Sequence, residues 1–388
     1  MLRYFSADWI FPVSGLPIKN GVIAVNSAGI IKEILNEATA VPLGAEISKY
    51  KGALIPGLIN THCHLELSHM LGKIPERTGL VNFVQHIIKN RQGSEDEILM
   101  AMWSADQQMQ KNGIVAVGDI SNTIVSKAVK QDSTIIYHTF VEAMGFNPES
   151  AQSVMDFAKG IRTQFEPLKA SVVPHAPYSV SPELFQLINQ NAEAENVFLS
   201  IHNQETRDEN LFFTNKTGDF LALYKFLGLD ISFFNPTGKT SLQSWLTYIK
   251  KQKILLVHNT VSSKADIQFA EQAHSDLFWC LCPQANLYIE HNLPDVGLLI
   301  SENVKITLGT DSLASNHQLN ILSEMKTLQQ QKKIGFNELL KWATINGAEF
   351  LGLTGLLGTL EVGKKPGLNL IQLSDDFVIE SDQVTKII

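Results

Sequence analysis

The feature of this sequence that most constrains its fold is a recurrence of short aliphatic runs, separated by longer stretches with helical periodicity. Eight such runs occur, at residues 53–59, 114–120, 134–142, 170–174, 197–202, 253–258, 277–282 and 304–309. Between them lie amphipathic segments such as 79–91, 181–196 and 337–351. Strands that are apolar throughout are typical of parallel sheets buried on both faces. Eight of them alternating with helices predict an α/β fold, a closed (β/α)8 TIM barrel, with an open doubly wound sheet as the alternative.

Both ends of the chain depart from this pattern. Residues 1–52 and 357–388 contain short strand signals interrupted by glycine, at 21–25, 29–34, 358–364 and 369–373. Neither end is long enough to bury a core of its own. We therefore expect a small composite β-sandwich domain formed by residues 1–52 and 357–388, with the barrel of residues 53–356 inserted between its two parts.

Composition narrows the class of protein. Hydrophobic residues make up 44% of the 388 residues, which is enough for a folded core and excludes a disordered chain. The net charge of −8 argues against a nucleic-acid partner, and no apolar run is long enough to span a membrane. The N-terminus lacks the unbroken apolar stretch of a secretory signal. The three cysteines, an odd number, favour a reducing compartment, so we expect a cytoplasmic protein. A homo-oligomer would be compatible with this fold.

Polar residues follow several of the apolar runs, at the strand ends where barrels carry their chemistry. The first run leads into His62 and His64, and their spacing puts both imidazoles on one face of an extended strand. This pattern alone is weak. However, His202 and His258 end the fifth and sixth runs, and Asp311 follows the eighth. Three imidazoles and one carboxylate would suit a divalent ion that keeps a position for water.

These residues lie in motifs that resemble the metal-dependent amidohydrolase superfamily, specifically its hydrolytic deaminase and chlorohydrolase branch. The motifs stand in the family's order and cover residues 53–316: PGLINTHCH at 56–64, HAPYSVSP at 175–182, HNQE at 202–205, His258, CPQAN at 282–286 and LGTDSLASN at 308–316. The resemblance implies that His62, His64, His202 and Asp311 hold one metal ion. Two-metal members carry a modified lysine near the position where this chain has His175. Zinc is favoured by the imidazole-rich donors, with iron as the alternative.

The same resemblance implies catalytic roles. A divalent ion lowers the pKa of bound water from about 15.7 to roughly 7, and Asp311 and His258 accept its proton. Glu205 protonates a ring nitrogen of the substrate, hydroxide attacks the neighbouring carbon, and ammonia leaves. The alternative for Glu205 is a solvated loop acid. His175 is expected to bind substrate, with a structural imidazole as the alternative.

Two further features have two interpretations each, and a third has a purely structural one. Glu66 either binds a ribose hydroxyl or caps a turn. Asn286 and Asn316 are expected to shape loops. About fifty residues between His202 and the sixth run are rich in aromatic side chains. They form either a lid or substrate wall for a flat ring, or a helical insertion with its own small core.

The resemblance therefore implies a hydrolase of non-peptide carbon–nitrogen bonds with a small-molecule substrate. We expect an aminohydrolase that acts on an adenosine-type nucleoside, such as aminodeoxyfutalosine, S-adenosylhomocysteine or methylthioadenosine. One alternative is a chlorohydrolase or cyclic-amide hydrolase of the same superfamily, which would share the attacking machinery. Another, from a different functional class, is a catalytically inert metal-binding scaffold.

Overall fold

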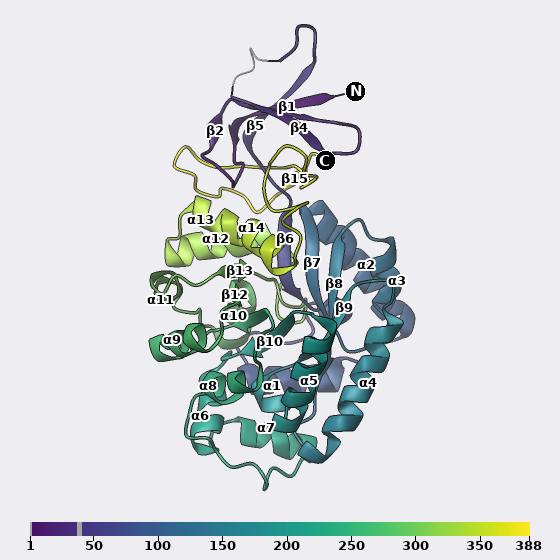
Figure 1. Ribbon diagram of the computed structural model, residues 1–388, viewed down its shortest axis with the longest axis vertical. Helices are drawn as coiled ribbons and strands as arrows, with labels where there is room; N and C mark the ends of the chain where they lie inside the picture. The colour runs from purple at the N-terminus through teal and green to yellow at the C-terminus, as the bar shows by residue number, and fades with distance from the viewer. Residues whose placement is uncertain (1, 37–40) are drawn as a thin grey trace.

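The computed structural model describes residues 2–36 and 41–388, so residues 1 and 37–40 of the expected β domain lie outside it. The fold has two parts, a β-sheet unit at one end and a larger α/β unit (Figure 1).

The sheet unit combines strands from both ends of the chain. Its seven strands are β1 (Arg3–Ile10), β2 (Ile18–Lys19), β3 (Val22–Val25), β4 (Ile31–Leu35), β5 (Ile47–Ile55), β14 (Asn369–Ile371) and β15 (Thr385–Lys386). They are ordered β15-β14-β5-β1-β3-β4, with β2 beside β1. β14 pairs antiparallel with β5, so the two termini share one sheet. Among the described residues this unit contains a single sheet, so the expected sandwich stays a prediction.

The α/β unit contains two parallel sheets of four strands each. The first pairs β6 (Leu58–Cys63), β7 (Ile114–Ser121), β8 (Ile136–Ala143) and β9 (Ala170–Pro174), in that order. The second pairs β10 (Leu199–Asn203), β11 (Ile254–His258), β12 (Leu277–Leu281) and β13 (Ile306–Leu308). All eight strands contribute buried side chains to one hydrophobic core.

The two parallel sheets meet at the carboxyl ends of their strands. There, His202 N donates to His175 O at 3.0 Å, and Thr310 N donates to His62 O at 3.0 Å. The ladders do not continue around all eight strands of the described chain, so the closed barrel stays a prediction. Two local features limit backbone hydrogen bonding between the two sheets. β13 has only three residues, and β9 ends in Pro174, which has no amide hydrogen to donate.

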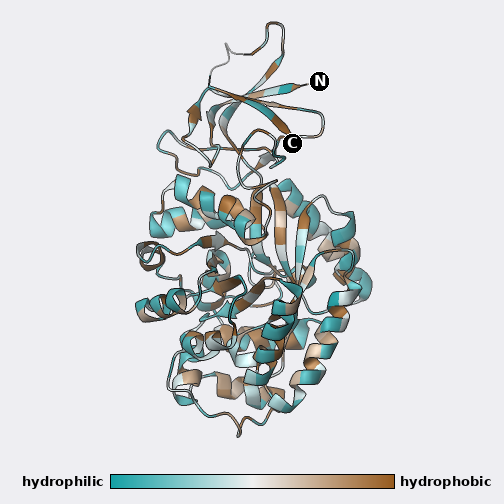
Figure 2. Cartoon of the chain, viewed as in Figure 1, coloured by the Kyte–Doolittle hydropathy of each residue, from teal (hydrophilic) through white to brown (hydrophobic). Residues whose placement is uncertain are grey.

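Helices surround the parallel strands (Figure 1), and Figure 2 shows hydrophilic residues along their outer faces. The α-helices are α1 (Leu80–Asn90), α2 (Glu95–Lys111), α3 (Lys127–Asp132), α4 (Ala151–Gln164), α5 (Pro182–Glu195), α6 (Arg207–Asn215), α7 (Phe220–Leu227), α8 (Ser241–Trp245), α9 (Lys264–Ala273), α10 (Pro283–Glu290), α11 (Val296–Ser301), α12 (Ile321–Lys332), α13 (Phe336–Trp342) and α14 (Ile345–Phe350). The 3-10 helices are η2 (Leu65–Met70), η3 (Pro148–Ser150), η4 (Pro177–Ser179) and η5 (Leu246–Tyr248). None of the described helices has the length and apolar character that crossing a bilayer requires.

Two predicted elements are each divided in the structure. The run at 53–59, expected to be the first barrel strand, contains the end of β5 and the start of β6. Pro56 and Gly57 separate them, and a side chain on Gly57 would collide with Val115 and with the carbonyl of Pro366. The helix expected over 337–351 is likewise two helices, α13 and α14, which are separated at Ala343 and Thr344.

The aromatic segment that follows β10 forms a small hydrophobic core of its own. Phe212 and Phe220 are fully buried, and Phe212 stacks on Phe234 with ring centroids 4.6 Å apart. This core also contains Leu80 and Phe83 of α1. The segment is therefore a helical insertion with its own core rather than a wall that presents its rings to a ligand. This core packs against α1.

Candidate active site

Four predicted side chains converge where the carboxyl ends of the two parallel sheets meet. β6 carries His62 and leads directly into His64, and the Nε2 atoms of these two residues lie 3.1 Å from each other. His202, at the end of β10, brings its Nε2 within 3.2 Å of His64 Nε2. Asp311 follows β13, and its Oδ1 lies 3.2 Å from His64 Nε2 and 3.6 Å from His62 Nε2. The structure thus brings these four residues to one point.

The donor set and its spacing fit a divalent metal ion. Two nitrogen ligands of a tetrahedral zinc ion are about 3.3 Å apart, given zinc–nitrogen bonds of about 2.0–2.1 Å. The contacts above, 3.1–3.6 Å, match that spacing. Burial lowers the pKa of His62 to about 4, that of His64 to about 3 and that of His202 to about 4, so all three imidazoles are neutral near pH 7. Neutral imidazoles and one carboxylate suit zinc or iron.

Hydrogen bonds fix the orientation of these donors. His202 Nδ1 lies 2.8 Å from His175 O, which places its hydrogen on Nδ1 and leaves Nε2 free to bind metal. Ser315 Oγ donates to Asp311 Oδ2 at 2.6 Å, so Oδ1 is the oxygen that faces the imidazoles. Asn316 Nδ2 donates to Thr310 O at 2.9 Å and so shapes the loop before Asp311, as the sequence suggested.

His258 and Glu205 lie beside this cluster. His258 ends β11 with a left-handed backbone, φ 75°, and together with His62, His202 and Asp311 it forms a group of donor atoms within 4.8 Å. Its Nε2 is 3.6 Å from Glu205 Oε1. Asn286 Nδ2 lies 3.3 Å from His258 Nδ1, so Asn286, expected only to shape a loop, also contacts this ring.

The proton affinities of the two nearby carboxyls diverge. Burial raises the pKa of Glu205 well above its usual value, and the negative charge of Asp311 raises it further. Burial alone would also raise the pKa of Asp311, but the hydrogen bond with His62 and the surrounding imidazoles hold it well below its usual value. Glu205 therefore holds its proton more tightly than a free glutamic acid does, whereas Asp311 favours the carboxylate form.

A cavity of about 160 Å³ opens onto the cluster. Its polar side contains His64, His202, Glu205, His258 and Asp311. The lining also includes an apolar stripe of α1, formed by Leu80, Phe83, Val84, Ile87 and Ile88. The cavity therefore combines reactive groups with an apolar surface, as a site for a heteroaromatic ring requires.

The two predicted substrate-binding residues are placed differently. His175 lines the cavity, and its Nδ1 lies 2.7 Å from Ser179 Oγ. Glu66 is outside the lining: it accepts hydrogen bonds from the backbone amides of Asn122 and Thr123, at 3.0 and 3.1 Å, and from Thr123 Oγ1 at 2.8 Å. These are contacts of the kind that cap a turn, and substrate binding by Glu66 stays a prediction. The lining also includes Glu142, which sequence reasoning missed although it stands near the end of β8, at the same strand position as the other site residues.

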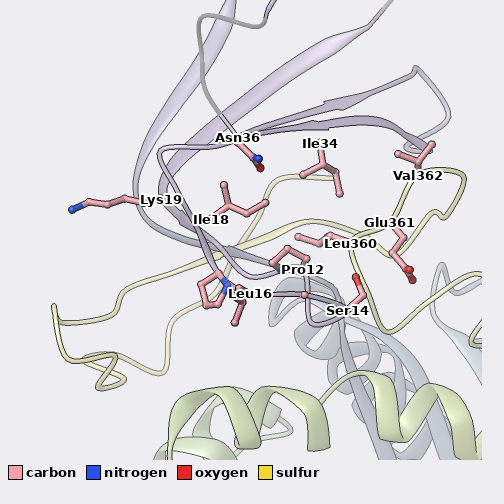
Figure 3. Close-up of a pocket in the computed structure, with 12 residues that line it drawn as sticks. Pro12, Ser14, Leu16, Ile18, Lys19, Ile34, Asn36, Leu360, Glu361 and Val362 are labelled. Atoms are coloured by element: carbon pink, nitrogen blue, oxygen red, sulfur yellow. The ribbon is translucent and has the colours of Figure 1, made fainter.

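A second cavity, of about 820 Å³, lies in the terminal sheet unit (Figure 3). It is lined by the 12–19 segment, Ile34, Asn36 and residues 360–362. Its lining contains no histidine, and its one carboxylate, Glu361, pairs with Lys364 at 2.7 Å. It lacks the acid, base and metal-ligating groups that the smaller cavity brings together.

Comparison with known proteins agrees with these features. The sequence profile of the amidohydrolase family matches residues 53–387. The chain is 28% identical over 353 residues to a 5'-deoxyadenosine deaminase of Methanococcus vannielii, with 85% of this chain and 77% of that protein covered. It is 25% identical over 350 residues to an aminodeoxyfutalosine deaminase of Nitratiruptor sp., with 86% and 82% covered.

Two solved structures show the same fold. The aminofutalosine deaminase of Helicobacter pylori in complex with methylthio-coformycin has a TM-score of 0.82 at 21% identity, covering 98% of this chain and 94% of that one. The atrazine chlorohydrolase of Arthrobacter aurescens complexed with zinc has a TM-score of 0.78 at 18% identity, covering 98% and 92%.

Proposed function

The chain belongs to the amidohydrolase family, and from that premise we propose that it is an aminohydrolase that releases ammonia from an adenosine-type nucleoside. Membership makes it a hydrolase of carbon–nitrogen bonds. The proposal goes further in two respects, the substrate class and the residues that act on it. The single observation that carries it is the convergence in one cavity of the buried Glu205 carboxyl, His258 and the cluster of imidazoles around Asp311.

The proposed ligands of the divalent ion are His62, His64, His202 and Asp311, with zinc favoured and iron as the alternative. When bound, the ion supplies Lewis acidity that makes water acidic enough to furnish hydroxide near neutral pH. Their contacts and neutral imidazoles support this assignment.

Side chains of the protein carry out the remaining steps. Glu205 donates its proton to a ring nitrogen, which makes the neighbouring carbon electrophilic. Asp311 and His258 take the proton released from the attacking water, and a carbon–oxygen bond forms at that carbon. The proton held by Asp311 or His258 then passes to Glu205, which delivers it to the amino group, so that the carbon–nitrogen bond breaks and ammonia leaves. As the carbonyl forms, the proton of the new hydroxyl restores Glu205. His175, which lines the same cavity, is proposed to contact the ring.

Among adenosine derivatives we favour nucleosides whose 5' group is apolar where it meets the stripe of α1. Aminodeoxyfutalosine, S-adenosylhomocysteine and methylthioadenosine are the candidates, and the first has the edge. The names of the relatives, 5'-deoxyadenosine deaminase and aminodeoxyfutalosine deaminase, support this substrate class. Cytoplasmic location agrees with three unpaired cysteines and remains part of the proposal, as does a homo-oligomeric state.

Ammonia release from a panel of adenosine derivatives tests the proposal, with chloride release from chlorotriazines measured in parallel. We expect ammonia from at least one nucleoside and no chloride. Chloride without ammonia would instead identify a chlorohydrolase. Neither product, from protein that carries one equivalent of metal, would favour the inert scaffold.

A further inference from the structure

The face of α1 that lines the cavity ends in an arginine. Leu80, Val84 and Ile87 lie on this face, and all three line the cavity. Arg91, which caps the C-terminus of the helix, continues the same face and also lines the cavity. The spacing from one of these residues to the next is four, three and four, which keeps side chains on one side of a helix. Of the lining residues within the described chain, Arg91 is the one with a permanent positive charge. The apolar stripe therefore leads to a cation.

The guanidinium of Arg91 is available to a ligand. The backbone fixes this residue in place: its amide donates to Ile87 O at 2.9 Å, and its carbonyl oxygen lies 2.9 Å from His69 Nε2. Among the described residues, its side chain has no hydrogen-bond or ion-pair partner, and its nitrogens are not closed off from solvent. The position of Arg91 is thus fixed while its charge remains uncompensated.

α1 runs from the half of the cavity that holds the reacting groups to the other half. Leu80 N donates to Glu290 Oε1 at 2.6 Å, and Glu290 belongs to α10, which follows β12 of the second parallel sheet. In the same sheet, Glu205 follows β10 and His258 ends β11. The carbonyl of Arg91 is held instead from η2, which follows β6 of the first sheet. At 1.5 Å per residue, Arg91 lies about 17 Å along the helix from Leu80. A substrate whose base meets Glu205 and His258 can therefore extend along the stripe toward Arg91.

The chemistry of this path limits what the far end of the substrate can be. The stripe favours apolar atoms beyond the sugar, and a guanidinium binds a carboxylate through two parallel hydrogen bonds. A phosphate attached directly to the 5' carbon would instead place its charge against the apolar residues. We therefore propose that Arg91 selects adenosine-type nucleosides whose apolar 5' substituent ends in a carboxylate, an inference that rests on the proposed function. It favours S-adenosylhomocysteine and aminodeoxyfutalosine, which each carry a carboxylate, over methylthioadenosine, which ends in a methyl group.

The test compares S-adenosylhomocysteine and aminodeoxyfutalosine with their own carboxamides, which have nearly the same shape without the charge. For the unaltered protein we expect kcat/KM for ammonia release to be about 10- to 100-fold higher with the better carboxylate than with its carboxamide, mainly through KM. Arg91→Met removes the guanidinium and keeps an unbranched side chain, and it should bring this ratio close to one. The comparison of substrates on the unaltered protein requires no variant to fold.

Lys89→Met is the matched control. Lys89 lies on α1 two residues before Arg91 and outside the cavity lining, and its Nζ is 5.0 Å from the centroid of the Phe226 ring. The variant removes the same charge from the same turn of the helix, so the preference for the carboxylate should remain. If Arg91→Met keeps that preference, or if Lys89→Met loses it equally, Arg91 does not bind the carboxylate and the proposal is wrong.

Two further substrates separate this inference from the proposed function. Higher kcat/KM with adenosine 5'-monophosphate than with either carboxylate nucleoside would identify the anion as a phosphate and overturn the proposal. Ammonia from methylthioadenosine, without any difference between carboxylate and carboxamide in the unaltered protein, would support the proposed function and overturn this inference alone. Absence of ammonia from every nucleoside would overturn both.

Discussion

At the scale of single residues, one small cavity holds two carboxyl groups whose pKa values are shifted in opposite directions. Asp311 is surrounded by imidazoles and accepts a hydrogen bond from Ser315, both of which favour its ionised form. Among the described residues, Glu205 has no cationic partner within ion-pair distance unless His258 is protonated, and burial raises the pKa of Glu205 well above its usual value. Such a divergence separates an acid from a base within one site. The division of labour we propose follows from it.

Replacing Glu205 with Gln tests that division. The amide keeps the size of the side chain but has no proton to give, and a single positioned acid typically contributes about 10²–10⁴ in rate. We expect kcat for ammonia release to fall by that factor while the metal content, measured by elemental analysis, stays at the wild-type value. Full activity in this variant would assign the acid role elsewhere, and loss of metal would make Glu205 a ligand.

Spacing and strand position together predicted which side chains the structure brings to one point, while the roles of these side chains stay predictions. His62 and His64 follow from strand geometry, and His202, His258 and Asp311 from their places after apolar runs. The place of Glu142 in the cavity and the contacts of Glu66 could not be predicted from the sequence, because they depend on which carboxylate oxygen accepts a hydrogen bond from a neighbouring amide. Such contacts are made between segments distant in the sequence, and no local pattern encodes them.

At the scale of elements, a buried ion pair supports the strand that carries the first two histidines. Lys130 of α3 and Asp119 of β7 are both fully buried, with Nζ and Oδ2 2.6 Å apart. Asp119 Oδ1 accepts a hydrogen bond at 2.8 Å from the backbone amide of Leu65, the residue after His64. The pair therefore ties α3 and β7 to the end of β6.

Lys130→Met should destabilise the protein, because it leaves Asp119 without its counter-ion in the interior. Breaking one partner of a buried pair costs about 3–5 kcal/mol, which urea unfolding would measure. Adding Asp119→Asn removes the unpaired charge, so the double variant should regain part of the loss. A single variant as stable as the wild type would show that the pair contributes no net stability.

β8 carries a buried histidine that should make stability depend on pH. Burial lowers the pKa of His138 to about 3, from 6.5 in an unfolded chain. Between these values the unfolded state holds a proton that the folded state lacks, so stability falls as the pH drops below about 6.5. His138→Phe removes this proton uptake and keeps an aromatic ring between Phe140 and Phe198.

The stability of His138→Phe relative to wild type should therefore rise by up to about 1.4 kcal/mol for each pH unit below 6.5. Urea midpoints of both proteins at pH 7 and pH 5.5 measure how the difference in their stability changes with pH. The contributions of the other histidines are the same in both proteins and cancel in this difference. Parallel curves for the two proteins would mean that His138 titrates alike in both states.

Element prediction was best for strands flanked by clear breaks and poorest where one apolar run crosses a boundary between sheets. The prediction at 170–174 coincides with β9, whereas the run at 53–59 contains parts of two strands that belong to different sheets. Hydrophobicity shows that a segment is buried and leaves open which sheet buries it. For the same reason, alternating strands and helices indicated parallel pairing but could not show where the ladders between sheets stop.

At the scale of the whole molecule, the proposed metal ligands connect the two parallel sheets. His62 lies on β6 of the first sheet and His64 directly follows this strand, whereas His202 lies on β10 of the second sheet and Asp311 follows β13. The sheets also meet here through a few backbone hydrogen bonds and through hydrogen bonds from the side chains of Asn60 and Thr61 to the end of β13. An ion that binds all four side chains would therefore cross-link the two halves of the α/β unit, and its binding free energy would add to the stability of the fold.

Chelation of the metal should consequently lower the melting temperature as well as abolish turnover. At a free metal concentration one hundred times Kd, binding contributes about 2.7 kcal/mol, so Tm should fall on chelation and recover when zinc or iron is restored. His202→Ala, which lacks one donor, should have a low Tm that added metal changes little. If chelation left the Tm of the wild type unchanged while turnover was lost, the ion would bind on one sheet only, and the cross-link between the sheets would have to come from protein contacts alone.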